Sequence, residues 1–114
     1  MNKARFTAPS AVIIGDPDIG EGTWIGFFCV LDGSNGLKIG KNCSIASGVH
    51  IYTHSTHELV TEGKPKLTGP VEICDNVAIG ANSVILHGCK IGRGVVIPAL
   101  TLMKPWTEIN KVDR

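Results

Sequence analysis

The sequence predicts an all-β fold, a parallel β-helix of about five coils, on three observations. First, five consecutive six-residue blocks between Ile73 and Leu102 each open with isoleucine: ICDNVA, IGANSV, ILHGCK, IGRGVV and IPALTL. Second, a period of six matches neither a helix nor a plain alternating strand, and short fixed repeats of this kind indicate a solenoid. Third, Gly or Asn fills the fourth position of most blocks, where a left-handed backbone conformation would let the chain turn a corner.

The same period extends towards the N-terminus, which allows the coils to be aligned. From Ile13 the blocks run to Leu31, the phase slips by two residues through DGSNG, and the register resumes at Ile39. Three blocks make one triangular coil, and coils stack about 4.8 Å apart. The predicted internal columns are Ile19, Ile39, Ile73 and Ile91; then Ile25, Ile45, Ile79 and Ile97; and then Leu31, Ile51, Ile85 and Met103.

These columns predict a single domain over residues 1–114. Residues 1–12 are weakly patterned and are expected to form an N-terminal cap, and residues 13–103 form the coils. The tail, 104–114, carries no repeat, and its Trp106 and Ile109 are available to fold back over the last open coil.

One long interruption, residues 54–71, has the sequence HSTHELVTEGKPKLTGPV, whose Gly, Pro, Lys and Thr content is typical of an exposed loop. In the predicted columns, this loop and the earlier phase slip leave from the same corner of the prism. Insertions at a solenoid corner often build the functional face, so we expect the site there.

Composition narrows the function classes. A formal net charge of +1 gives no reason to expect a nucleic-acid or anionic-membrane partner. The apolar runs are too short for a membrane span or a signal peptide, which predicts a cytoplasmic location.

Cys29, Cys43 and Cys89 take the small fifth position of their blocks and are interpreted as buried apolar residues. Without a Cys-x-x-Cys spacing, no metal is expected.

The four histidines are the candidates for chemistry. We interpret His50 and His87 as polar surface residues. His54 and His57 open the long loop, and two titratable imidazoles at the root of the only long loop make a plausible acid–base site.

The segments IYTHSTHEL, GPVEICDNVAIGANSVIL and GCKIGRGVV resemble the hexapeptide-repeat acyltransferases, in particular the sugar, maltose and thiogalactoside acetyltransferase branch. The resemblance covers roughly residues 13–104. It implies a left-handed β-helix and a homotrimer whose active sites lie between chains. It also implies transfer of an acetyl group from acetyl-CoA to a hydroxyl or amine of a sugar or nucleotide-sugar.

The resemblance further implies roles for single residues. Counting back from the later blocks, His54 matches the family's general base and His57 a second loop histidine; counting from the N-terminal side differs by two residues. Ala81, Ala99 and Lys104 match coenzyme-binding positions. Asp32 is the carboxylate nearest to the family's acceptor-binding aspartate.

Two departures keep other functions open: Ala78 replaces a family tryptophan, and the usual C-terminal Gly-x-Pro-Ala stretch is absent. One alternative is a catalytically silent scaffold, which coenzyme binding would distinguish. Another is a zinc-dependent carbonic anhydrase on the same helix, which needs three histidines converging across a subunit boundary, for example His50, His54 and His87.

Overall fold

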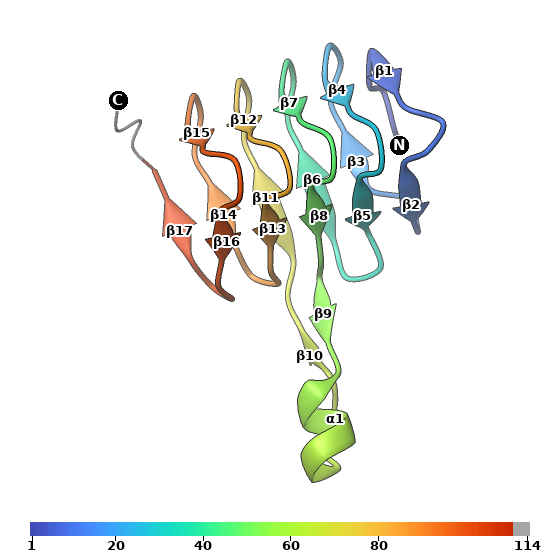
Figure 1. Cartoon of the computed structure of the whole chain (residues 1–114), viewed down its shortest axis with the longest axis vertical. Helices are drawn as coiled ribbons and strands as arrows, with labels where there is room; N and C mark the ends of the chain where they lie inside the picture. Colours follow the sequence, from blue (N-terminus) through green and yellow to red (C-terminus); the bar gives the residue numbers. More distant parts are fainter. Residues whose placement is uncertain (111–114) are drawn as a thin grey trace.

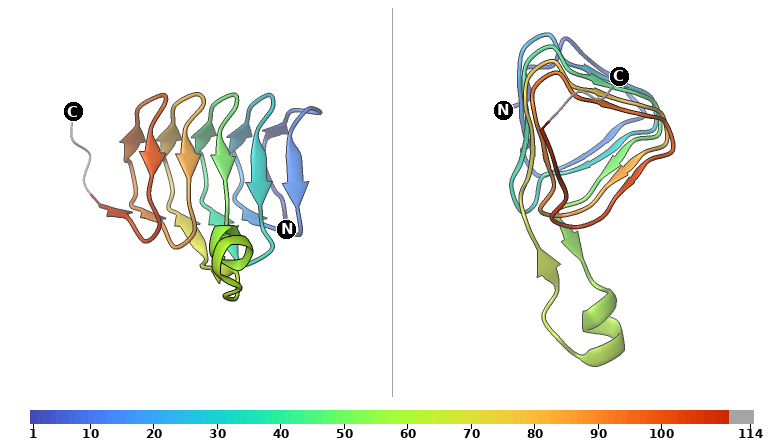
Figure 2. Two further views of the ribbon diagram at one scale, coloured as in Figure 1. Left: turned by 60° about the horizontal axis from the view of Figure 1, so that its bottom comes forward. Right: turned by 90° about the vertical axis from the view of Figure 1, so that its left-hand side faces the viewer.

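The computed structural model describes residues 1–110 and shows stacked coils with one protruding hairpin (Figure 1), and the coils form a triangular prism when viewed end-on (Figure 2). In the end-on view of Figure 2 the chain runs clockwise as it advances towards the viewer, so the β-helix is left-handed. Each of its three sides is a five-stranded parallel sheet, which confirms the predicted five coils.

The three sides are named by their strands. Side 1 contains β3 (Asp18–Ile19), β6 (Leu37–Ile39), β11 (Val71–Ile73), β14 (Lys90–Ile91) and β17 (Glu108–Ile109). Side 2 contains β1 (Phe6–Thr7), β4 (Trp24–Ile25), β7 (Ser44–Ile45), β12 (Ala78–Ile79) and β15 (Val96–Ile97). Side 3 contains β2 (Val12–Ile14), β5 (Val30–Asp32), β8 (His50–Ile51), β13 (Val84–Ile85) and β16 (Leu102–Met103).

The predicted columns form the core. On side 1, for example, Ile39 pairs with Ile19 on one neighbouring strand and with Ile73 on the other, and Ile73 pairs in turn with Ile91. All twelve column residues are at most 2% exposed. Cys29, Cys43 and Cys89 are buried among them, and burial raises the pKa of each thiol. These cysteines therefore act as small core residues, as the repeat predicts.

The fourth position of a block turns the corner in the left-handed conformation, as predicted. Asn76 and Asn82 adopt it with φ near 58°, and so do bulkier residues: Phe28 at 60°, Leu100 at 62° and Trp106 at 63°. For these bulky side chains the left-handed conformation is sterically unfavourable, so the surrounding coil must impose it.

Both ends of the chain differ from the expectation. The predicted cap at residues 1–12 instead supplies the first strands, because β1 pairs with β4 and Asn2 bridges to Ile19. The tail does not fold back as far as residue 110: β17 extends side 1, with Ile109 beside Ile91, and Trp106 occupies a corner. The repeat thus continues into both ends of the chain, although the residue types there do not match those of the other blocks. The rest of the tail prediction, at 111–114, lies outside the described residues.

The long insertion is a structured hairpin. β9 (His54–Ser55) pairs antiparallel with β10 (Leu67–Thr68), and α1 (His57–Glu62) caps the tip before Gly63 ends the helix at φ 66°. Val71 is buried in β11, so the insertion ends at Pro70 rather than at Val71. None of the described helices is long and apolar enough to cross a membrane.

The outward residues give the sides different characters. On side 1 the central row is charged with alternating sign: Asp18, Lys38, Glu72, Lys90 and Glu108. On side 2 the row is Phe6, Trp24, Ser44, Ala78 and Val96. On side 3 it is Val12, Val30, His50, Val84 and Leu102. Side 1 therefore suits contact with solvent, whereas sides 2 and 3 are mainly apolar.

Candidate active site

The corner between sides 3 and 1, from which the hairpin leaves, brings Asp32 and His54 together. Asp32 ends β5, and His54 follows β8 one coil later. Because Leu31 pairs with Ile51, the two corner segments that follow them lie side by side. The Nδ1 atom of His54 is 2.6 Å from Oδ2 of Asp32.

Asp32 is fully buried, and both oxygens of its carboxylate accept hydrogen bonds from neighbouring residues. Its Oδ1 accepts from the Ser34 N–H at 3.0 Å and from the Ser34 hydroxyl at 2.6 Å. Its Oδ2 accepts from the Thr53 N–H and hydroxyl, both at 3.0 Å, as well as from His54. Burial alone would raise the pKa of Asp32, but the hydrogen bonds from Ser34, Thr53 and His54 outweigh it and hold the pKa well below its usual value.

An ionised Asp32 fixes the tautomer of a neutral His54. A carboxylate can only accept hydrogen bonds, so Nδ1 carries the proton in this contact and Nε2 keeps its lone pair. The imidazole is 35% exposed, which leaves it accessible from outside the prism. The pair therefore forms an oriented imidazole that can accept a proton at Nε2.

The geometry changes the interpretation of Asp32. We expect it from the resemblance to bind an acceptor, but its carboxylate is buried and already accepts five hydrogen bonds. An acceptor cannot reach it without breaking that network. In the structure Asp32 instead contacts the His54 imidazole and orients it.

His57 lies apart from this pair. It begins α1 in the hairpin, its side chain is 67% exposed, and its nearest charged neighbour is Glu58, with Nε2 and Oε2 3.9 Å apart. Among the described residues no side chain orients its ring as Asp32 orients His54. Of the two loop histidines, the geometry favours His54 as the base.

The two histidines interpreted as surface residues are partly or fully covered. His87 is only 3% exposed, in the corner one coil beyond the hairpin. Its Nδ1 is 3.5 Å from the Ser55 hydroxyl, and its ring meets the edge of Trp106 with centroids 6.2 Å apart. His50 is half-buried on side 3 and contacts the Tyr52 hydroxyl through Nδ1 at 2.9 Å. The surface interpretation is therefore wrong for His87.

The predicted coenzyme residues divide between two corners. Ala81 and Ala99 each follow a side 2 strand and precede a side 3 strand, so they lie at the corner between those sides. Lys104 follows β16 and lies at the hairpin corner, two coils beyond His54. Within one chain, the side 3 strands therefore separate Ala81 and Ala99 from His54.

Sequence reasoning missed Ser34, Thr53, Ser55 and Trp106. A signal for Thr53 was present, because aligning Leu31 with Ile51 places the residues after Asp32 next to those after Tyr52. Trp106 carried no such signal, since Trp is atypical at a corner that favours Gly or Asn.

Comparison with known families agrees with the architecture. Residues 70–103 match the sequence profile described as bacterial transferase hexapeptide (six repeats). The chain belongs to the hexapeptide-repeat family of left-handed β-helices.

Relatives of this hexapeptide-repeat protein differ in their described activities. It is 42% identical over 94 residues to γ carbonic anhydrase 1 of Arabidopsis thaliana mitochondria, covering 80% of this chain and 31% of that protein. Among solved structures, it superposes on AntD, an N-acyltransferase from Bacillus cereus in complex with dTDP and 3-hydroxybutyryl-CoA. The TM-score is 0.80 at 24% identity, over 94% of this chain and 62% of that one.

A maltose O-acetyltransferase from Clostridium difficile superposes with a TM-score of 0.60 at 22% identity, over 99% of this chain and 70% of that one. At these identities the two structural matches show a shared fold. The chain spans about a third of the length of the first curated relatives it matches, which have 31–33% of their length covered.

Proposed function

We propose that the protein is an acyltransferase that moves an acetyl group from acetyl-CoA to a hydroxyl or amine of a sugar or nucleotide-sugar, with His54 as general base. The observation that carries the proposal is the contact between His54 and the buried, ionised Asp32 at the root of the hairpin. Two fold neighbours support the reaction class, being described as an N-acyltransferase with an acyl-CoA and as a maltose O-acetyltransferase.

In this reaction, Nε2 of His54 takes the proton of the acceptor hydroxyl or amine as that atom attacks the thioester carbonyl. When the carbon–sulfur bond breaks, the imidazolium returns the proton to the departing thiolate. Asp32 stabilises the transient imidazolium and keeps Nε2 directed outward. The thioester is part of the co-substrate, so the chain itself supplies the base and its orientation.

Sides 2 and 3 support a homotrimer with the active site between chains. Their outward rows are mainly apolar, and exposed residues such as Val12, Val96 and Leu102 leave a surface that water covers unfavourably. In a threefold ring, each prism would place side 2 against side 3 of its neighbour and leave charged side 1 in solvent. In that packing His54 would face the neighbour's corner between sides 1 and 2, and Ala81 and Ala99 would lie at the corner where the packed sides 2 and 3 meet.

The test of the base is a pair of matched variants. His54→Ala should lower turnover by about 10²–10⁴-fold while coenzyme affinity, measured by calorimetry, stays nearly unchanged. His57→Ala is the control and should retain most of the turnover. If His57→Ala were the damaging change and His54→Ala harmless, His54 would not be the base.

The shared site has a separate test. Inactive His54→Ala chains and chains blocked by Ala99→Trp are unfolded, mixed and refolded together. If the groove takes His54 from one chain and Ala99 from the next, some mixed trimers keep an intact groove and activity returns. Mixtures that stay inactive, although mixed trimers form, would place the site within one chain.

A zinc enzyme is the second candidate, because a 42% identical relative is described as a γ carbonic anhydrase. The Nδ1 atoms of His54 and His87 both have a hydrogen-bond partner, and the Nε2 atom of each ring remains available as a possible zinc ligand. In the part of the chain that the structure describes, however, no three His, Cys, Asp or Glu side chains gather as a metal site. A neighbouring chain would have to complete it, and zinc bound stoichiometrically by the purified protein, without coenzyme binding, would favour this candidate. Protein that binds neither zinc nor acetyl-CoA would favour a silent scaffold.

A further inference from the structure

The direction of the hairpin is set at its root. β9 and β10 form a two-stranded sheet of their own, and no residue of α1 is buried. Figure 1 shows the hairpin standing out from the prism, with its tip away from the coils. His54 is the first residue of β9, so a movement of the hairpin at its root also moves the imidazole proposed as general base. The contacts at the root therefore decide how well this base is oriented.

The preceding coil holds one side of the root. Thr68 pairs with His54, and the Gly69 N–H donates to the Thr53 carbonyl at 3.1 Å, so the two ends of the hairpin form one short ladder. Asp32 binds this ladder through the Thr53 N–H and through Nδ1 of His54. The carboxylate therefore holds the ladder from the side of the earlier coil.

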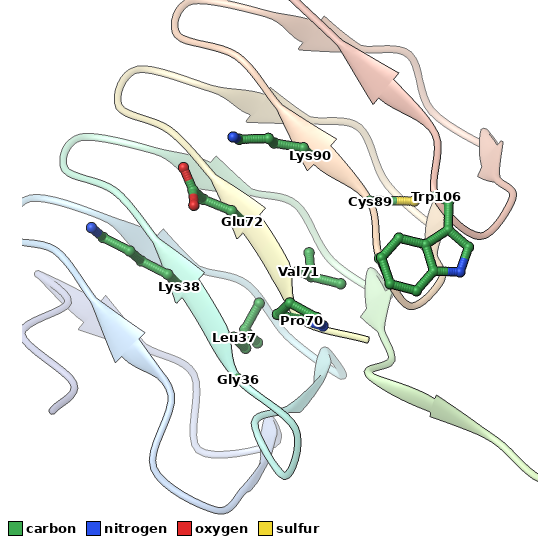
Figure 3. A pocket seen from close by; sticks show the side chains of 10 residues that line it. Gly36, Leu37, Lys38, Pro70, Val71, Glu72, Cys89, Lys90 and Trp106 are labelled. Carbon is green, nitrogen blue, oxygen red and sulfur yellow. The ribbon is translucent and has the colours of Figure 1, made fainter. Parts of the chain in front are cut away.

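The ring of Trp106 holds the ladder from the side of the later coils. It lies against Gly69, where a Cβ would come within 3.0 Å of the ring. It also meets the His87 imidazole edge-to-face, and Nδ1 of His87 is 3.5 Å from the Ser55 hydroxyl. In Figure 3 Trp106 lines a groove on side 1 together with Pro70, the residue that leads from the hairpin into β11. The indole thus contacts one end of the hairpin directly and the other end through His87.

The backbone of Trp106 is strained in this position. Its φ is 63°, and on the preceding coil the same corner position is occupied by Gly88, which adopts this conformation without strain. The ring is 64% exposed, so it adds little to the buried core. If the residue served only the turn of the coil, Gly would suit it better. Strain of this kind persists where a particular side chain is needed at a site, and here the ring meets the root of the hairpin.

We propose that Trp106 is a positioning residue that keeps His54 in contact with Asp32. The indole and the His87 ring close the root of the hairpin from the later coils, so the ladder cannot swing away from the carboxylate on the earlier coil. Without the indole, the hairpin has a wider range of directions, and His54 leaves Asp32 for part of the time. The effect on acetyl transfer rests on the proposed function, whereas the effects on the hairpin and on the imidazole do not.

The experiment compares Trp106→Gly with Leu100→Gly. Both variants replace an exposed, left-handed corner residue by Gly, but Leu100 lies at the corner between sides 2 and 3, away from the hairpin. Hydrogen exchange of the amides of residues 54–69, measured by mass spectrometry, should become about 2- to 10-fold faster in Trp106→Gly. It should stay at the wild-type rate in Leu100→Gly. Trp106→Phe keeps an aromatic ring at the corner and should restore most of the protection.

The orientation of His54 is measured without any substrate. Its Nδ1 atom is 2.6 Å from Oδ2 of Asp32, so the Nδ1–H proton should give a downfield NMR signal in wild type and in Leu100→Gly. His54→Ala identifies this signal by its loss, and in Trp106→Gly the signal should broaden or disappear. In an acetyl-transfer assay, Trp106→Gly should lower turnover about 10- to 100-fold while coenzyme affinity stays unchanged.

The proposal is overturned if hairpin exchange is equal in Trp106→Gly and Leu100→Gly, or if Trp106→Gly keeps the Nδ1–H signal. Faster exchange that extends to β7 and β12 in the coils would indicate a general loss of stability, and it would also overturn the proposal. Unchanged turnover after loss of the signal would show that the reaction does not need this positioning. Wild-type protein that transfers no acetyl group, beside both effects in Trp106→Gly, would refute only the proposed reaction.

Discussion

Replacing Asp32 by Asn tests the network that holds His54. The two side chains have almost the same shape, but the carboxylate accepts a main-chain N–H at each oxygen: Ser34 at Oδ1 and Thr53 at Oδ2, both at 3.0 Å. An Asn side chain has only one oxygen, so in either orientation its amino group faces a main-chain N–H. A buried donor without a partner costs about 1–3 kcal/mol, and we expect Asp32→Asn to lower the free energy of unfolding by that amount at pH 7.

The stability difference between wild type and Asp32→Asn should also depend on pH, in a direction that follows from the pKa of Asp32. The pKa of Asp32 is depressed in the folded state, so its ionised form stabilises the protein above the unfolded-state pKa of about 3.9. That contribution is lost as the pH falls towards the folded-state pKa. Urea denaturation should therefore show a difference between wild type and Asp32→Asn that is full at pH 6–7 and shrinks below about pH 4. Equal stabilities at pH 7, or a difference that does not change with pH, would refute the network.

The same substitution separates positioning from folding. Without a carboxylate at Nδ1, the imidazole loses its preferred tautomer and its stabilised imidazolium, so turnover should fall while coenzyme affinity does not. Ser34→Ala is the matched control, because it removes one hydroxyl from Oδ1 but leaves both main-chain N–H bonds and the His54 contact intact. It should cost less stability and retain most of the activity.

Two further predictions concern the corners and are measured by urea denaturation. Leu100 is left-handed at φ 62° and 79% exposed. Leu100→Gly should therefore stabilise the protein, because it relieves about 1–2 kcal/mol of backbone strain, partly offset by the greater entropy of Gly in the unfolded chain. Lower stability would mean that the Leu100 side chain contributes packing in the assembled protein. Gly88→Ala should destabilise more than Gly63→Ala, since both have positive φ but only the Cβ at Gly88 meets the Trp106 ring. Equal losses would show that Trp106 does not pack on Gly88.

The register of the coils could be predicted from the sequence alone, because the first position of each block determines it. Ile at the first position of each block faces inward, and a slip of one residue would turn that set outward. This constraint holds through the phase slip before Ile39 and across the hairpin before Ile73, where the predicted pairs are confirmed. The left-handed corners at Phe28 and Leu100 followed from the same register, even though neither residue favours that conformation.

The site was predictable only in part. The repeat register determines which residues reach the same corner, but it does not determine which side chains form hydrogen bonds there or which become buried. The corner and His54 follow from the repeat and the loop, but the burial of Asp32 depends on donors from Ser34 and Thr53. His87 resembled a surface residue because its position in the block is near a corner. It is buried because Trp106, one coil later, contacts its ring, and a tail that seemed to lack the repeat supplies that tryptophan.

A β-helix explains why one corner collects so much chemistry. Every coil repeats the same three turns, so residues far apart in sequence reach the same corner on successive coils: Asp32, His54, His87 and Trp106. An insertion at that corner leaves the internal columns intact, as the unbroken pairing on side 1 shows on both sides of β11. The corner can therefore gain a hairpin, a buried carboxylate or an exposed indole without disturbing the core. By the same reasoning, substrate differences within such a protein should arise at the corners and outward rows, while the inward columns stay fixed.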